Sequence, residues 1–342
     1  MTNSTDTPHL MPDPAVAKPT AGSGVRPPAR RLPALPDVLL GVAVIALLIF
    51  LVATVGFFTQ TSLVALLSDS AITGIIALGM TVIALSGNVL SFSLGVTASV
   101  ATLVCLATLQ YGAAVSILLT VLVGAAIFSV QGLLIGALGA NPVIVAVASL
   151  AAISGTAIQV TGGSTVQPSG GGADWLSGKI VGLPIVFVVF LAFAVVGQAT
   201  LSGTTFGRRL LMIGTNREVA ETSGQPVVRV IVIGYTIAGG CAASVGVFLA
   251  VRYGATGFSQ SSGGGVQYDY DAIAAVLVGG TSLRGGRGAI WRTVVGVLLI
   301  EALGNALLLH GFSTQARELT NGVVVAVALV VSDLRSRGSF QR

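Results

Sequence analysis

Long apolar runs separated by short polar breaks occupy most of the chain after residue 37. A run of about 20 apolar residues can cross the ~30 Å hydrocarbon core of a bilayer as a helix. A membrane barrel would instead show alternating segments of about 10 residues, and none is visible. The pattern therefore predicts an all-α polytopic membrane protein of about ten transmembrane helices. These spans are expected at residues 38–58, 63–86, 93–110, 113–138, 142–160, 182–200, 229–251, 270–283, 289–309 and 319–333.

The eighth run, residues 270–283, is too short for a complete crossing and ends in Gly279 and Gly280. Irregular backbone survives at membrane depth only where protein or water covers it. We therefore expect a broken or tilted element that its neighbours shelter.

Composition supports a membrane protein, because 8% of the residues are charged, against about 25% in an ordinary soluble domain. The 45 glycines suit close helix packing in lipid, where small residues let backbones approach. The net charge of +5 is not taken as a sign of nucleic-acid binding. Cys105 and Cys241 lie inside apolar runs, so we expect packing residues there, without a disulfide or a metal.

The first 36 residues differ from the rest, since they hold eight of the 12 prolines among Ser, Thr, Ala and Gly. Such a segment cannot bury enough apolar surface to fold. The expected organisation is a disordered cytoplasmic tail over residues 1–36, a transmembrane domain over 37–334 and a cytoplasmic C-terminal tail over 335–342.

The positions of the Lys and Arg residues predict the orientation of the bundle. With the N-terminus inside and ten spans, most of the basic residues fall on the cytoplasmic side, as the positive-inside rule requires. The outside keeps only Lys179, Arg252 and Arg317. Both termini are therefore expected in the cytoplasm. The basic residues expected on that side are Lys18, Arg26, Arg30, Arg31, Arg208, Arg209, Arg217, Arg229, Arg284, Arg287, Arg292, Arg335, Arg337 and Arg342.

The longest cytoplasmic loop, residues 202–228, carries signals for a short helix closed at both ends. Thr215 and Glu218 have the spacing of a capping box. Gly224 can take the left-handed position after the last turn, and Pro226 prevents continuation. A helix this short is marginal in water on its own. It is either held by a partner surface or is a surface turn between two spans, and the pattern leaves both open.

Two stretches carry a family resemblance. GRRLLMIGTNREVAETSGQPVVRV at Gly207–Val230 and YDYDAIAAVLVGGTSLRGGRG at Tyr268–Gly288 resemble the permeases of sugar-type ABC importers, which serve ribose, xylose, galactose and autoinducer-2 uptake. Weaker likenesses lie at Ala77–Val82, Gln131–Gly136 and Asn141–Val145. The resemblance covers roughly residues 62–334 in colinear order.

This resemblance implies a type II ABC importer-like bundle in the bacterial inner (plasma) membrane. It implies a second permease copy or a paralogue, a cytoplasmic ATPase dimer and a periplasmic solute-binding protein. The chain has no Walker A motif and no catalytic constellation, so no cofactor is expected and ATP would be bound by the partner subunit. The residues that the resemblance implies for ATPase coupling are Gly214, Asn216, Arg217, Glu218, Ala220, Ser223 and Gly224.

The family's GGIDLSVG segment has a divergent counterpart at Ser86–Gly95, which lacks the acid and is one residue longer. The expected cargo is a sugar or a similar small polar solute. A branched-chain amino acid or nucleoside importer is the nearest alternative. An ion-coupled secondary transporter is the alternative from a different class.

Few ionisable residues interrupt the spans. Glu301 shares a helix face with Asn305, and a carboxylate at mid-membrane costs ~2.5–3.5 kcal/mol on insertion scales. It either lines a path or forms a structural pair with a neighbouring Ser, Thr or Arg. Asp269 and Asp271 are expected to cap a helix N-terminus rather than to face a vestibule. The residues expected along the translocation path are Asn88, Ser91, Ser93, Asn141, Glu301 and Asn305.

Overall fold

The computed structural model describes residues 54, 56–88, 91–166, 179–180, 183–253, 256–257, 265–282 and 285–338. The expected first span at 38–58 and the N-terminal tail lie almost wholly outside this part of the chain. The described residues form a helical bundle, as the sequence predicted. The last helix continues to Gly338, beyond the predicted start of the C-terminal tail.

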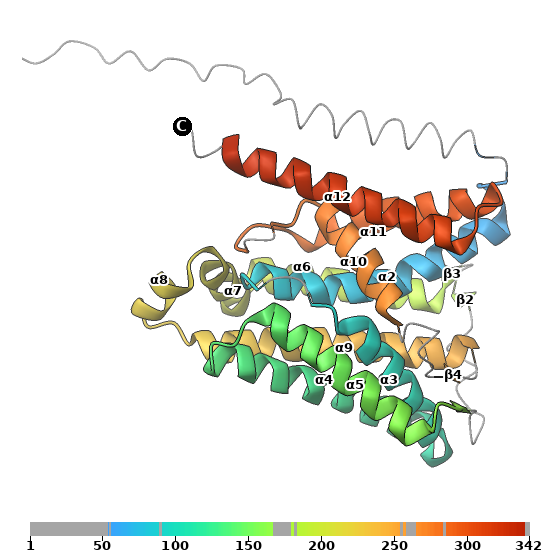
Figure 1. Cartoon of the computed structure of the whole chain (residues 1–342), viewed down its shortest axis with the longest axis horizontal. Coiled ribbons are helices and arrows are strands. Elements are labelled where there is room, and N and C mark those ends of the chain that lie inside the picture. The colour runs from blue at the N-terminus through green and yellow to red at the C-terminus, as the bar shows by residue number, and fades with distance from the viewer. Residues whose placement is uncertain are drawn as a thin grey trace, which may run out of the picture.

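Nine helices follow the predicted runs closely (Figure 1), and seven of the described helices are long and apolar enough to cross a membrane. The count of ten spans is therefore not confirmed, although each run from the second onward forms a helix. The bounds are α2 Gln60–Leu85, α3 Leu94–Thr108, α4 Ala113–Ala137, α5 Pro142–Thr161, α6 Ile185–Gly203, α9 Val227–Tyr253, α10 Val266–Val278, α11 Ile290–Leu309 and α12 Thr314–Gly338.

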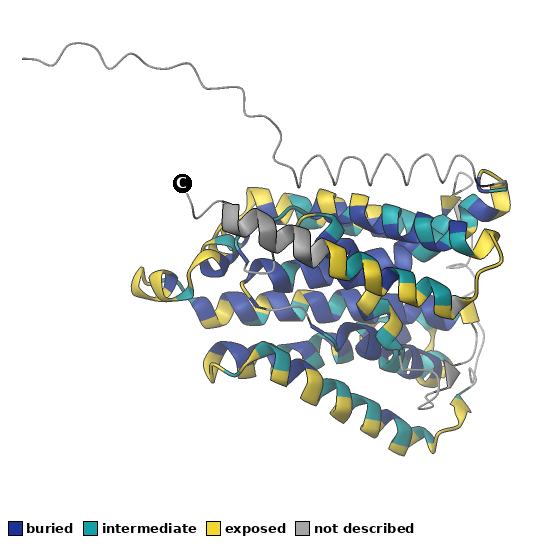
Figure 2. Ribbon diagram, turned by 45° about the horizontal axis from the view of Figure 1, so that its top comes forward, coloured by how far each residue is buried: buried dark blue, intermediate teal, exposed yellow. Residues whose placement is uncertain are grey.

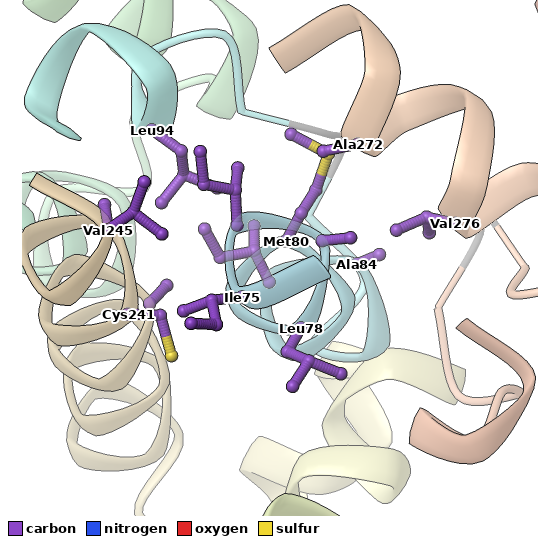
Figure 3. Close-up of a cluster of buried hydrophobic side chains, with 14 of the residues drawn as sticks. Ile75, Leu78, Met80, Ala84, Leu94, Cys241, Val245, Ala272 and Val276 are labelled. Atoms are coloured by element: carbon purple, nitrogen blue, oxygen red, sulfur yellow. The ribbon is translucent and has the colours of Figure 1, made fainter. Parts of the chain in front are cut away.

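Helix α9 lies at the centre and packs against α2, α3 and α4. The core between α2, α9 and α10 holds small and branched side chains, among them Ile75, Cys241 and Val276 (Figure 3). The contact between α4 and α9 is closer still. A Cβ on Gly124 would lie 2.7 Å from the Gly239 carbonyl oxygen, and a Cβ on Gly239 would lie 2.3 Å from that of Gly124. Only glycine at both positions allows this approach.

Large apolar residues on α4, α5 and α6 are exposed, and Figure 2 shows exposed stretches of ribbon on the outside of the bundle. Leu118 and Val130 on α4, Val160 on α5 and Val195 on α6 are examples. A water-facing surface of this kind would be unfavourable, whereas hydrocarbon solvates it well. These faces therefore suit contact with hydrocarbon rather than with water.

The predicted short eighth element is confirmed, because α10 has 13 residues and ends at Gly279. Its N-terminus meets the N-terminus of α3 inside the bundle. A Cβ on Gly95 would lie 2.1 Å from the Gly265 carbonyl oxygen, so the two backbones touch. Protein covers the point where these two helix ends meet, as irregular backbone at membrane depth requires.

Two short strand pairs lie at the end of the bundle opposite α8, the short helix Arg217–Thr222 (Figure 1). Strand β1, Thr165–Val166, pairs with β4, Thr256–Gly257, and β2, Lys179–Ile180, pairs with β3, Leu183–Pro184; both pairs are antiparallel. They join the connections between helices at that end.

Candidate functional site

The loop expected to contain one short helix contains two. Helix α7, Thr205–Thr215, follows α6 directly and precedes α8. The predicted capping box is wrong, because Thr215 closes α7, where its hydroxyl donates to the Leu211 carbonyl at 2.9 Å. Asn216 caps α8 instead, since its Oδ1 accepts from the Val219 amide at 3.1 Å. The side chains buried at Leu210 and Ile213, one turn apart, are the signal that could have predicted α7.

The C-terminal end of α8 was predicted correctly. Gly224 has a φ of 72°, the left-handed conformation, and the Gln225 amide donates to the Ala220 carbonyl at 3.0 Å. The Ser223 hydroxyl donates to the Val219 carbonyl at 2.7 Å. These bonds satisfy carbonyls that a helix end leaves unpaired.

Helix α8 is fixed to the bundle on one side and free on the other. Ala220 is buried, and the Arg217 guanidinium donates to the Gly136 carbonyl at the end of α4 at 3.0 Å. Arg217 also pairs with Glu221 at 2.9 Å. Glu218 and Val219 face outward, and Val219 is 57% exposed. The outward face therefore offers an apolar side chain beside an acid.

Three turns meet beneath this loop through glycines, and we call Gly87, Gly214, Gly285 and Gly286 the glycine junction. The Gly286 amide donates to the carbonyl of Leu85, the last residue of α2, at 3.1 Å. A Cβ on Gly214 would lie 1.9 Å from that carbonyl oxygen, and one on Gly285 would lie 2.4 Å from Gly87 Cα. The end of α7 is thus in backbone contact with the end of α2 and with the turn between α10 and α11.

The polar residues expected along a path occupy separate places. Asn88 is buried and donates to the Ser86 hydroxyl at 2.9 Å. Ser91 and Ser93 contact each other at 3.0 Å before α3, and Ser93 donates to Gln131 Oε1 at 3.2 Å. Asn141 is exposed and caps α5, where its Oδ1 accepts from the Val143 amide at 2.9 Å. The structure does not bring Asn141 together with the others, and their part in a path stays a prediction.

Glu301 and Asn305 on α11 both face α2. Asn305 donates to the Ser62 hydroxyl at 2.9 Å. The Glu301 carboxylate accepts from the Thr73 hydroxyl at 2.6 Å and pairs with Arg317 of α12 at 2.7 Å. Glu301 therefore has the Thr and Arg partners that its interpretation as a structural pair requires. The sequence placed Arg317 in an outside loop, whereas its side chain lies against α11.

Asp271 belongs to the same group of charges. Its Oδ2 lies 3.6 Å from the Arg317 guanidinium, and its Oδ1 accepts from Asn321 at 2.5 Å. Asp271 therefore pairs with α12 and does not cap a helix, contrary to the prediction. Gly304 makes room for this arrangement, because a Cβ there would lie 2.6 Å from Arg317 Nε.

Asp269 does cap a helix, but the helix is α3 rather than its own. The carboxylate is fully buried and accepts from the Gly95 amide at 2.8 Å. A carboxylate at a helix N-terminus satisfies an unpaired amide and interacts favourably with the helix dipole. Asp269 thereby ties α10 to α3 where their ends meet.

Replacing Asp269 with alanine is expected to lower the stability of the bundle by ~1–3 kcal/mol, because the buried Gly95 amide loses its acceptor. The thermal midpoint of the purified protein in detergent measures this loss. Asp269→Asn keeps an acceptor oxygen and should recover most of it. Equal midpoints for the alanine variant and the wild type would contradict the capping role.

Among the described residues, no group of three or more His, Cys, Asp or Glu side chains is placed to hold a metal. Cys105 and Cys241 are free and buried.

Comparison with known proteins identifies the family. A family profile described as "Branched-chain amino acid transport system / permease component" matches residues 62–332, well over half of the chain. The chain belongs to this family. A permease component is the membrane part of an ABC transporter rather than an enzyme. The permease is accordingly a multi-pass membrane protein, in agreement with its apolar helices.

Several characterised relatives are similar to the permease over most of their length. The ribose import permease protein RbsC of Bacillus subtilis is 32% identical over 285 residues, which cover 82% of this chain and 87% of RbsC. RbsC of Escherichia coli K12 is 30% identical over 84% of this chain and 90% of its own. The autoinducer 2 import system permease protein LsrD of Yersinia enterocolitica is 30% identical over 77% and 81%.

A further relative, "Probable ABC transporter permease protein YphD" of Escherichia coli K12, is 36% identical over 170 residues. This match spans about half of each chain, 48% of the permease and 49% of YphD. No solved structure matches the permease.

Proposed function

We propose that the permease is the membrane subunit of an ATP-driven importer that moves a sugar or a similar small polar solute by alternating access. The observation that carries this proposal is the backbone contact that the end of α7, next to α8, makes at the glycine junction. A movement of α8 would pass through α7 to the end of α2 and to the turn between α10 and α11, by backbone contacts that have no flexible side chain between them. The similarity to ribose and autoinducer-2 permeases supports the class of solute.

In this proposal α8 is the coupling helix and its end of the bundle faces the cytoplasm of a bacterial cell, as the distribution of Lys and Arg predicts. A cytoplasmic ATPase dimer binds there, and a second permease copy or a paralogue completes the membrane part. A periplasmic binding protein delivers the solute at the opposite end. Both termini then lie in the cytoplasm.

The docking face follows from the exposures on α8. Ala220 faces the bundle and Arg217 bonds to α4 and Glu221, so these two hold the helix in place. Glu218 and Val219 remain to meet the partner. An exposed valine beside an acid fits an ATPase groove with an apolar floor and a basic rim.

Val219→Asp is expected to remove the ATPase from the permease when the tagged protein is purified in mild detergent. Burying a new carboxylate in an apolar contact without a partner is strongly unfavourable. The amount of ATPase that copurifies should fall at least about tenfold, which is ~1.4 kcal/mol of binding energy. Glu218→Arg tests the charge on the same face.

The matched control is Gln315→Asp, another exposed position on a helix but at the opposite end of the bundle. It should leave the ATPase bound. Unchanged copurification with Val219→Asp would contradict the docking face. Solute uptake into ATP-free liposomes by the permease alone would overturn the ATP-driven importer and favour an ion-coupled carrier.

A further inference from the structure

A polar cavity of about 210 Å³ lies inside the bundle, lined by residues of α2, α9, α10, α11 and α12. Exposure falls steadily from its mouth to its floor. The Asp69 and Arg252 side chains at the mouth are 39% and 38% exposed, whereas those of Asp271 and Glu301 at the floor are 6% and 2% exposed. The cavity is therefore a recess with a charged floor and a more exposed mouth at Asp69 and Arg252.

The recess opens away from the coupling loop. Arg252 lies at the last turn of α9, whose first residues follow α8 and the turn after it. A helix of 27 residues is about 40 Å long. The mouth thus lies at the end of the bundle opposite α8, where an imported solute would arrive.

The lining combines acceptors, donors and aromatic surface. Three carboxylates, Asp69, Asp271 and Glu301, accept hydrogen bonds, and the guanidinium groups of Arg252 and Arg317 donate them. Tyr253 and Tyr268 add aromatic rings near the mouth. Each hydroxyl of a sugar both donates and accepts, so neighbouring hydroxyls can bond to a carboxylate and a guanidinium at once.

The ion pairs among these side chains do not balance all of the charge in the recess. Arg317 contacts Glu301 at 2.7 Å, whereas its distance to Asp271 is 3.6 Å, longer than a hydrogen bond. The five charged groups leave a formal excess of one negative charge. Ionisable groups inside a membrane bundle are costly and mark substrate pathways. A network that served only to join helices would be cheaper as well-packed apolar contacts.

We propose that this recess binds a small polyhydroxylated solute at the permease's outer end, before the solute crosses. The inference rests on the proposed importer function and adds a site within a single protomer to it. Arg317, held over Gly304, donates to the solute from the floor. Asp69 and Arg252 hold the solute from the mouth, where their ion pair of 2.6 Å opens to admit it.

Thiol protection tests this site. In a background with Cys105 and Cys241 replaced by alanine, Gln267→Cys places an exposed thiol on the cavity wall. The permease, assembled with its ATPase in liposomes, is labelled with a charged methanethiosulfonate reagent with and without D-ribose, D-xylose or D-galactose. Import of each sugar is measured on the same liposomes with the solute-binding protein added. At least one sugar should slow labelling about fivefold or more, as a site occupied for four fifths of the time requires.

The control is Gln315→Cys, an exposed position two residues from Arg317 that does not line the recess. Its labelling rate should not change with sugar. Adding Glu301→Gln, which keeps the size of the floor residue and removes its charge, should abolish the protection at residue 267.

The outcomes separate the site from the function. Import of a sugar that gives no protection at residue 267 overturns the site and leaves the importer standing. Protection without import keeps the site and overturns the importer. If neither is observed, both are overturned. Equal protection at residue 315 would also overturn the site, because the effect would then lie outside the recess.

Discussion

Import by a Gly214→Ala permease is expected to fall to about one tenth of the wild-type rate or less, a loss of ~1.4 kcal/mol or more at the limiting step. The added methyl group would lie 1.9 Å from the Leu85 carbonyl oxygen and 2.6 Å from the Gly286 nitrogen. Both atoms belong to backbone, so the end of α7 must move away from α2. Import into liposomes and ATP hydrolysis are measured on the same preparation, and hydrolysis should continue while import is lost.

Two controls separate the junction from a general intolerance of alanine. Gly203→Ala, at the end of α6, adds a methyl group with nothing within 4 Å. Gly280→Ala has a positive φ, as Gly87, Gly285 and Gly286 have, and like Gly203 it has nothing within 4 Å of the added methyl group. Both should import well above the level of Gly214→Ala. If Gly214→Ala imports as fast as Gly203→Ala, the junction does not transmit the movement of α8.

Arg317→Leu is expected to cost about 3–5 kcal/mol of stability, the usual loss when one partner is removed from a buried ion pair. Glu301 and Asp271 would both stay buried without the guanidinium that lies between them. The thermal midpoint in detergent should fall by several degrees. Loss of contacts between α12 and the rest of the bundle would follow, since α10 and α11 meet α12 through this group.

The double variant Arg317→Leu/Glu301→Leu should be more stable than Arg317→Leu alone. Removing Glu301 removes one of the two stranded carboxylates, and the coupling between two contacting residues is then non-additive. If the stability losses of the two single variants, Glu301→Leu and Arg317→Leu, simply add in the double variant, the 2.7 Å ion pair contributes nothing measurable to stability.

The sequence predicted the bundle well because lipid demands continuous apolar runs, and nine of the ten expected runs form helices. Even the short α10 was visible from the length of its run and from Gly279 and Gly280. The same signal failed at α7. This helix lies outside the spans, and its pattern is amphipathic over only 11 residues, so it was included in a loop.

Pairing between distant residues was beyond the sequence. Glu301 was recognised as costly, yet its partner Thr73 is 228 positions away. Arg317 looked like an ordinary loop charge because it follows the end of α11 by only a few residues. The recess depends on where five helices bring such residues together, and helix periodicity carries no information about that. The cap at Asn216 was missed for a different reason, since Thr215 beside it offers an equally good capping side chain.

The contact between Gly124 and Gly239 limits how the bundle can change shape. The carbonyl oxygen of each glycine fills the space that a Cβ on the other would need. A larger residue at either position could not be accommodated by a smaller one opposite, because the residue opposite is already glycine. At these two glycines helices α4 and α9 meet backbone to backbone, and the side-chain pairs Phe128–Tyr235 and Ser129–Thr236 join the same helices nearby. We therefore expect α4 and α9 to move together as one rigid body when the molecule opens and closes.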